Sequence, residues 1–303
     1  MEREQIKTPY RQAAMALPPR LREEAIALPG RVQQRAEELR LRVGRPMSVV
    51  VDGEETFLDG PSVEGRDLEQ LVEIASRASL HAVLPQICRG YLTMEGGHRI
   101  GLCGTAALRE GEIHSLSRLS SANIRIARQV RGAADPVLKK LCPGGRLVST
   151  LILAPPGMGK TTLLRDVVRQ VSDGKGCVPL RVALADERGE VAALYNGLPQ
   201  LDVGARTDIL DGCPKAQGLM LLLRAMNPQV LVVDEITAPE DVAALRTAVG
   251  CGVTLLATAH GAGREDLERR TVYRPLLEER LIQRRVTIRR NGDRRDYTVE
   301  ELD

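Results

Sequence analysis

The sequence predicts an α/β protein of two domains, in which a smaller α+β domain precedes one built on a mostly parallel sheet. The chain has 303 residues, and at roughly 100–200 residues per domain this length allows about two domains. Its second half alternates continuous apolar runs with helical segments, which is the pattern of a parallel sheet covered by helices. Its first half holds short, strand-like pieces bounded by glycine, which is typical of an α+β arrangement.

The first half divides into a tail and a small domain. Residues 1–17 mix charge and proline, so we expect a flexible N-terminus, followed by an α+β domain over residues 18–141. Residues 21–39 predict one or two helices, interrupted at Pro29-Gly30. Further helices are expected at 67–82 and 135–141, and short strands at 38–43, 47–51, 56–58, 91–94, 99–102 and 106–108.

The pattern changes after a short linker. Residues 142–146 contain Cys-Pro-Gly-Gly, which favours a linker, and residues 147–303 form the expected second domain. The dipeptide Asn291-Gly292 predicts a hairpin between residues 284–290 and 294–299. Buried strands are expected at 147–153, 178–185, 229–233 and 253–258, and a helix at 161–171.

Composition excludes several classes of protein. The net charge is only +3 and the chain has five Tyr, one Phe and no Trp, so we expect no nucleic-acid partner that binds by charge or base stacking. The six cysteines include no C-x-x-C pair, which favours reduced thiols over zinc or a disulfide framework. No apolar run reaches 18 residues and the N-terminus lacks the apolar region of a signal peptide, so a cytoplasmic location is expected.

A glycine-rich segment joins an expected strand to an expected helix. Residues 154–161 match the pattern G-x-x-x-x-G-K-[ST], except that Ala154 replaces the first glycine. Such a loop curls its backbone N–H groups around a phosphate, and the helix adds its positive end. We expect Lys160 to reach the β- and γ-phosphates of ATP and the Thr161 hydroxyl to ligate Mg²⁺. The expected nucleotide-binding residues are Ala154, Pro155, Pro156, Gly157, Met158, Gly159, Lys160, Thr161 and Thr162.

Two further strands end in acidic pairs. The run 229–233 leads into Asp234, the expected partner of Mg²⁺, and Glu235, which could polarise the attacking water. Another strand ends in Asp186 and Glu187. Because the carboxyl ends of parallel strands meet at one crevice, Glu187 is a rival candidate for the catalytic base. The alternative for this second pair is an ordinary surface loop.

A third strand carries a polar tip that ends in His260. From the same edge of the sheet, this histidine could sense the γ-phosphate or relay its presence to a neighbouring subunit. The alternative is a plain hydrogen-bonding residue.

The order of these motifs resembles that of the RecA-like ATPases of type II and type IV secretion systems. Those ATPases carry a Walker A loop, an acidic box, a Walker B strand and a histidine box, in this order. The matching segments here are residues 154–162, 186–188, 234–235 and 258–260.

Two other segments narrow the resemblance. Residues 96–104 and 202–215 look like the stage III sporulation protein AA family of endospore-forming bacteria, and the resemblance covers roughly residues 20–300. It implies a mother-cell ATPase of the channel to the forespore, on the cytoplasmic side, that works at the membrane with small membrane proteins. The related secretion ATPases form six-subunit rings in which arginines from the N-terminal domain or a neighbouring protomer complete the site. The candidates here are Arg99, Arg125, Arg128 and Arg206, and each could instead form a surface ion pair.

The leading hypothesis is therefore an ATP-hydrolysing motor of a secretion-type channel in endospore formation. Glu235 or Glu187 would orient the attacking water, and His260 would take part in catalysis. An alternative is a nucleotide-gated assembly scaffold with negligible turnover, against which the presence of both candidate bases argues. A DNA-translocating RecA-like protein is a third possibility, disfavoured by the balanced charge and the few aromatic residues.

Overall fold

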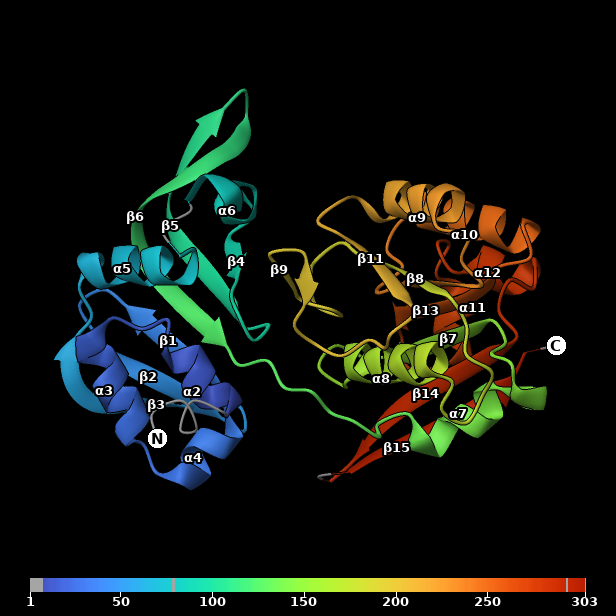
Figure 1. Ribbon diagram of the computed structural model, residues 1–303, viewed down its shortest axis with the longest axis horizontal. Coiled ribbons are helices and arrows are strands. Elements are labelled where there is room, and N and C mark those ends of the chain that lie inside the picture. Colours follow the sequence, from blue (N-terminus) through green and yellow to red (C-terminus); the bar gives the residue numbers. More distant parts are fainter. Residues whose placement is uncertain (1–7, 78–79, 293, 303) are drawn as a thin grey trace. The chain divides into compact units, whose positions relative to one another are not determined.

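The computed structural model describes residues 8–77, 80–292 and 294–302, and the chain divides into two compact units (Figure 1). The expected fold class is confirmed, because an antiparallel sheet with helices precedes a mostly parallel sheet covered by helices. Unit 1 comprises Met1–Arg128 and Ala193–Gln200, and unit 2 comprises Gln129–Ala192 and Leu201–Asp303.

Unit 1 combines helices with an antiparallel sheet. Its elements are α2 (Pro9–Ala14), α3 (Pro19–Ala27), α4 (Gly30–Arg35), β1 (Ala36–Arg42), β2 (Pro46–Val51), β3 (Glu54–Ser62), α5 (Gly65–Ala75), α6 (Leu80–Cys88), β4 (Tyr91–Thr93), β5 (Arg99–Arg109), β6 (Glu112–Arg125), β9 (Leu194–Tyr195) and β10 (Leu198–Pro199). The main sheet has the order β3-β2-β1-β6-β5-β4, and its neighbouring strands are antiparallel. Side chains such as Leu39, Ile100 and Ile124 are fully buried in its core.

Helix α2 corrects the expectation that residues up to 17 are flexible. Tyr10 and Leu17 are at most 1% exposed, and the Tyr10 hydroxyl donates to the Ala25 carbonyl of α3 at 2.9 Å. The segment is ordered because this aromatic side chain and its neighbours complete the core of unit 1. Residues 1–7 of the expected tail lie outside the described residues.

The β5–β6 hairpin is longer than its expected pieces. The predicted strands 99–102 and 106–108 are one continuous strand, paired with β6 along its length. Its outer half projects from the unit (Figure 1), and most of its side chains are exposed. Because neither face of this part is buried in the unit, it lacks the alternation of apolar and polar residues that marks a half-buried strand.

Unit 2 is a parallel sheet with an antiparallel strand at one edge. Its elements are α7 (Asp135–Leu141), the 3-10 turn η1 (Pro143–Gly145), β7 (Thr150–Ala154), α8 (Lys160–Asp173), β8 (Val182–Asp186), β11 (Thr207–Asp211), α9 (Lys215–Ala225), β12 (Val230–Val233), α10 (Pro239–Gly250), β13 (Thr254–His260), α11 (Arg264–Arg269), α12 (Arg274–Glu278), β14 (Arg284–Asn291) and β15 (Arg294–Glu301). The order is β11-β8-β12-β13-β7-β14-β15, parallel except for β15. The predicted strands are continuous apolar runs because both faces of the sheet are covered.

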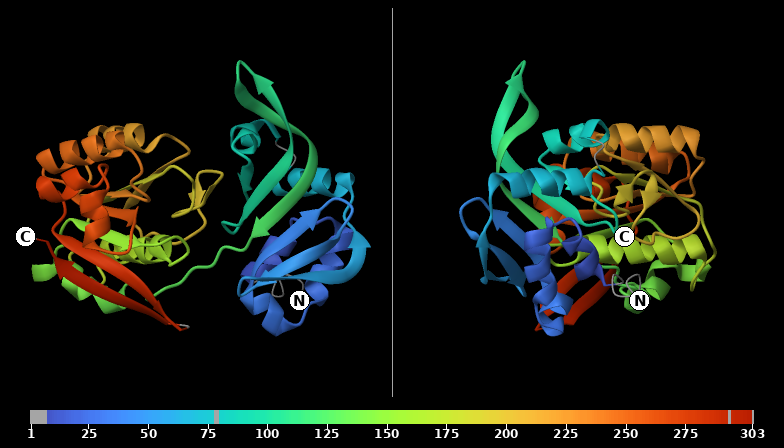
Figure 2. Two further views of the ribbon diagram at one scale, coloured as in Figure 1. Left: turned by 180° about the vertical axis from the view of Figure 1, so that it is seen from behind. Right: turned by 60° about the vertical axis from the view of Figure 1, so that its left-hand side comes forward.

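Helices cover the two faces of this sheet. Helices α7 and α8 lie on one face, and α9, α10, α11 and α12 lie on the other (Figure 2). Their side chains pack in two separate cores. Val137 and Leu141 of α7 are at most 1% exposed in the first of these cores. Helix α7 therefore belongs to unit 2, and the division between the units falls after Arg128 rather than at the expected 141.

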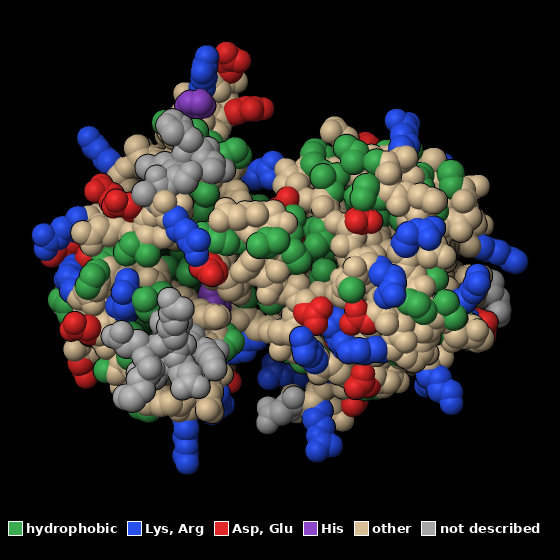
Figure 3. Space-filling model, viewed as in Figure 1, with side chains coloured by type: hydrophobic (Ala, Val, Ile, Leu, Met, Phe, Trp, Pro, Cys, Tyr) green, Lys and Arg blue, Asp and Glu red, His purple; other side chains and the backbone are tan. Residues whose placement is uncertain are grey.

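Charges of both signs are interspersed on the surface. On the face seen in Figure 3, Lys and Arg side chains lie among Asp and Glu side chains on each unit, in keeping with the net charge of +3. Among the described residues, no helix is long and apolar enough to cross a membrane.

Candidate active site

The loop between β7 and α8, residues 154–160, has the backbone of a phosphate-binding loop, and we call it the P-loop. Gly157 and Gly159 adopt φ values of +74° and +90°, in the left-handed region that favours glycine. Ala154 is the fully buried last residue of β7, so this position does not require glycine. Helix α8 begins directly at Lys160, which places the positive end of its dipole at the loop.

Lys160 lies within the loop and is only 6% exposed. Its Nζ is 3.1 Å from the carbonyl oxygens of Ala154 and Pro155 and 3.0 Å from Nδ1 of His260. Burial lowers the pKa of Lys160, against the opposing effect of Glu235 and Asp234. These acceptors hold the amine in the loop, and an anionic phosphate would bind it more strongly than the neutral acceptors do.

Asp234, which directly follows β12, is bound by hydroxyl groups from two other elements. Thr161 at the start of α8 donates to Oδ2 at 2.8 Å, and Thr258 of β13 donates to Oδ1 at 2.6 Å. A hydroxyl and a carboxylate in contact at the end of a P-loop are hard oxygen donors of the kind that Mg²⁺ takes together with phosphate oxygens. The pair therefore fits the ion expected with a nucleotide.

Glu235 is held from both sides. His260 Nε2 lies 2.6 Å from its Oε1, and Arg188 Nη1 donates to its Oε2 at 3.1 Å. Its backbone has φ = +56°, an uncommon conformation for a residue with a side chain. The backbone N–H of Glu235 donates to the Thr258 hydroxyl at 2.8 Å, which helps to hold this turn.

Asp186 and Glu187 have different surroundings. The Asp186 carboxylate is 2% exposed and accepts the backbone N–H groups of Glu190, Val191 and Ala192 at 2.9–3.3 Å. Burial raises the pKa of Asp186, although these hydrogen bonds oppose the shift. Asp186 thus organises the loop after β8, while Glu187 forms an ion pair of 3.4 Å with Lys215.

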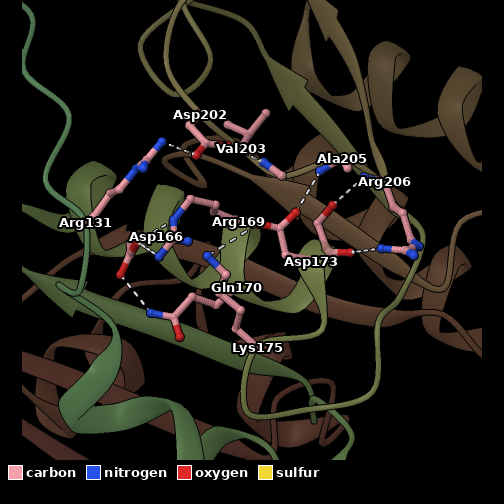
Figure 4. A network of polar contacts seen from close by, with 12 residues as sticks. Arg131, Asp166, Arg169, Gln170, Asp173, Lys175, Asp202, Val203, Ala205 and Arg206 are labelled. Atoms are coloured by element: carbon pink, nitrogen blue, oxygen red, sulfur yellow. Dashed lines mark hydrogen bonds and ion pairs between the residues drawn. The ribbon is translucent and has the colours of Figure 1, made fainter.

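The four candidate arginines have other partners. Arg206 donates to the Ser172 carbonyl at 3.0 Å, in the last turn of α8 (Figure 4). Arg128 donates to carbonyls at the end of α4, including those of Gln34 at 2.9 Å and Ala36 at 2.6 Å. In unit 1, Arg125 pairs with Glu38 at 3.1 Å, and the Arg99 guanidinium lies 3.9 Å from the centre of the Tyr91 ring.

The polar contacts around Arg206 belong to a network that connects α8 to neighbouring segments. The buried Asp166 pairs with Arg169 at 2.6 Å (Figure 4), and it accepts the Ala134 N–H at 2.9 Å. Arg131 pairs with Asp202 at 2.9 Å. Residues 202–206, the start of the segment 202–215 singled out in the sequence, thus lie at the far end of the P-loop helix, where Arg206 bonds Ser172.

The structure brings together five of the predicted site residues: Lys160, Thr161, Asp234, Glu235 and His260. Two residues that sequence reasoning did not select join them. Arg188 directly follows the acidic pair of β8, which was a usable signal. Lys215 donates to the Glu235 carbonyl at 2.5 Å. The only sequence feature that could have identified this lysine was its place in the segment 202–215.

Solved structures of other proteins share this fold. The structure of the Legionella pneumophila ATPase DotB covers 88% of the chain and 77% of its own length, with 18% identity and a TM-score of 0.58. That of the pilus retraction motor PilT with bound ADP covers 90% and 81%, with 17% identity and a TM-score of 0.61. The chain therefore shares the fold of these two proteins, and its P-loop lies at the carboxyl edge of the parallel sheet.

The sequence comparisons go further than the fold. The family model described as sporulation stage III, protein AA matches residues 16–298. The stage III sporulation protein AA of Bacillus subtilis (strain 168) is 40% identical over 255 residues, which are 84% of this chain and 82% of that protein. An uncharacterized protein, ycf45, of Porphyra purpurea is 28% identical over 76% of this chain and 37% of its own length. The chain belongs to the sporulation stage III protein AA family.

Proposed function

We propose that this chain is a Mg²⁺-dependent ATPase whose site lies at the carboxyl ends of β7, β12 and β13. One observation carries the proposal: the P-loop lysine, the Walker B carboxylates and the strand-end histidine are joined by direct contacts. Lys160 contacts His260, His260 contacts Glu235, and Thr161 contacts Asp234. A glycine-rich turn without a ligand has no need of this arrangement.

The roles follow from the chemistry of each group. The P-loop N–H groups and Lys160 would bind the β- and γ-phosphates and stabilise the charge that develops there. Thr161 and Asp234 would hold Mg²⁺, which supplies further positive charge at the phosphates when bound. Glu235 would orient the attacking water and accept its proton.

Glu235 is a better candidate for the base than Glu187. Its carboxylate adjoins Asp234 in sequence and contacts the histidine that also touches Lys160. Glu187 is instead paired with Lys215, whose Nζ also bonds the backbone of Glu235. In this proposal Glu187 positions the loop that carries the base.

The biological setting is inferred from the family and the fold. Family membership in sporulation and the likeness to secretion ATPases support a motor that works in the mother-cell cytoplasm, as a homo-oligomer such as a six-subunit ring. It would meet the membrane through small partner proteins. Arg125 is the favoured candidate for an arginine in trans among the four, because its side chain is 60% exposed, whereas Arg128 and Arg206 bond backbone carbonyls.

A second function is supported by the way Glu235 is bound. Both of its carboxylate oxygens are engaged, by His260 and by Arg188, so an attacking water would compete with these two groups for the base. A scaffold that assembles on ATP without turnover would have this property. Turnover measured for the wild type and for Lys160→Ala separates the two, because a motor shows lysine-dependent hydrolysis and a scaffold shows lysine-dependent binding alone.

A further inference from the structure

The C-terminal hairpin of unit 2 directs two arginines along the face that carries the P-loop. Residues directly opposite each other in an antiparallel pair point to the same side of the sheet. Ile288 faces Tyr297 and Arg290 faces Arg295 across β14 and β15. Ile288 and Tyr297 pack in the core shared with α8. The alternation therefore places Arg290 and Arg295 on this same side, just beyond the core.

Contacts at the P-loop show that this side of the hairpin lies close to the loop. Met158 of the P-loop packs against the same core as Tyr297. A Cβ atom built on Gly159 would lie 3.0 Å from Cζ and 3.1 Å from Nε of Arg295. The Arg295 guanidinium therefore covers the P-loop at Gly159, one residue before Lys160.

The two paired arginines concentrate positive charge beside the P-loop. Like charges directly opposite each other in a sheet are destabilising. Arg290 donates through Nε to the Gly292 carbonyl at 3.0 Å. Across residues 8–77, 80–292 and 294–302, the structure gives no hydrogen bond or ion pair for the guanidinium group of Arg295, whose backbone pairs with β14. A negatively charged group beside both guanidinium groups would offset their repulsion.

We propose that Arg295, supported by Arg290, forms an additional anion subsite that binds the phosphates of a nucleotide held in the P-loop. The inference rests on the proposed function. It adds a contact between Arg295 and the phosphates, which lies outside the sequence motifs that predict the nucleotide site. A guanidinium offers several N–H donors in one plane and suits phosphate oxygens. It would add positive charge from the outer side of the loop, whereas Lys160 supplies it from within.

The hairpin offers a matched control. Arg294 lies next to Arg295 in sequence but points to the opposite side of the sheet, where it faces Asn291. Both arginines are exposed, so removing either one changes the charge equally and leaves the core intact. Arg294→Ala therefore controls for the loss of one positive charge near the site.

The test is equilibrium binding of ATP, ADP and adenosine, by isothermal titration, to the full chain and to Arg295→Ala, Arg295→Lys, Arg294→Ala and Lys160→Ala. We expect Arg295→Ala to weaken ATP and ADP by about tenfold, as for one lost hydrogen bond to a charged group. Arg295→Lys should recover part of the lost affinity. Arg295→Ala should leave the affinity for adenosine unchanged. Arg294→Ala should leave the affinity for ATP and ADP unchanged.

Three outcomes would overturn the inference. Unchanged ATP and ADP affinity in Arg295→Ala would remove the contact altogether. An equal loss of adenosine affinity in Arg295→Ala would show that Arg295 contacts the nucleoside and not the phosphates. An equal loss of ATP and ADP affinity in Arg294→Ala would show that the loss reflects the net charge alone. Lys160→Ala separates this inference from the proposed function: if it binds ATP like the wild type, the nucleotide site itself is wrong, whatever Arg295 does.

Discussion

His260 Nε2 lies 2.6 Å from Oε1 of Glu235. The other ring nitrogen, Nδ1, is 3.0 Å from the Nζ of Lys160. A protonated lysine can only donate, so Nδ1 accepts its hydrogen bond and the imidazole proton lies on Nε2, directed at the glutamate. His260 thus links the group that would bind the γ-phosphate to the group that would activate water. A phosphate that draws Lys160 away would change the hydrogen bonding of the base.

Glu235→Gln should abolish turnover and preserve nucleotide binding. The amide keeps the shape of the side chain but cannot accept a proton from water, so we expect hydrolysis to fall by at least about 100-fold. Steady-state turnover and ATP affinity, measured on the same preparation, check this. Glu187→Gln is the matched control and should retain most activity; if it is the inactive variant and Glu235→Gln is active, the two glutamates exchange roles.

His260→Ala should reduce turnover without a comparable loss of ATP affinity. The change removes one hydrogen bond to a charged carboxylate, so we expect a fall of about tenfold in the rate at saturating ATP. His260→Gln should recover part of this rate, because its amide can donate to Glu235. A positioning role is contradicted if both variants turn over ATP at the wild-type rate.

Arg206→Ala should lower stability more than it lowers activity. Its guanidinium bonds the Ser172 carbonyl at the end of α8, so we expect a loss of about 1 kcal/mol in the free energy of unfolding. Urea unfolding and turnover per folded molecule check this, with the exposed Arg224→Ala on α9 as control. Full stability combined with lost turnover would instead support Arg206 as an arginine that acts on a neighbouring protomer.

The stability of unit 1 should fall between about pH 6.5 and pH 4. His98 is fully buried and its Nδ1 accepts the Ala127 N–H at 3.1 Å; burial, with a smaller effect of Arg128, lowers the pKa of His98 to about 4 from 6.5. In the unfolded chain, His98 becomes protonated near pH 6.5, whereas in the folded unit it becomes protonated only near pH 4. Its unfolding free energy therefore decreases as pH falls through this window, by at most about 1.4 kcal/mol per pH unit.

Urea titrations at several pH values would measure this dependence. His98→Gln should flatten it, whereas His114→Gln, at an exposed position on β6, should leave it unchanged. An equally steep decline in His98→Gln would assign the pH dependence to other groups.

The parallel sheet and the P-loop were predictable because their physics is local. A strand covered on both faces must be apolar along its length, as 229–233 is, and a phosphate-binding turn requires glycine where φ is positive, as at Gly157 and Gly159. Edge and projecting strands lack such a constraint. The half-buried edge strand β11 and the outer half of the β5–β6 hairpin therefore gave no clear pattern.

The contacts within the site depend on strand order, which the sequence does not reveal. Lys160 and His260 are 100 residues apart in sequence and meet because β13 lies beside β7. The dipeptide Asn291-Gly292 predicted the C-terminal hairpin. Only the parallel pairing of β14 with β7 places that hairpin beside the P-loop, where the Arg295 side chain lies next to Gly159.

Mg²⁺-dependent ATP turnover of the wild type, measured beside that of Lys160→Ala, tests whether the P-loop drives ATP hydrolysis. Lys140→Ala on the exposed side of α7 is the charge-matched control, and the mass in solution is recorded with and without ATP. We predict turnover that requires Lys160, is unaffected at Lys140 and rises as subunits assemble. Turnover that persists in Lys160→Ala, or no turnover in the assembled wild type with the proposed membrane partners supplied, would contradict the proposed function.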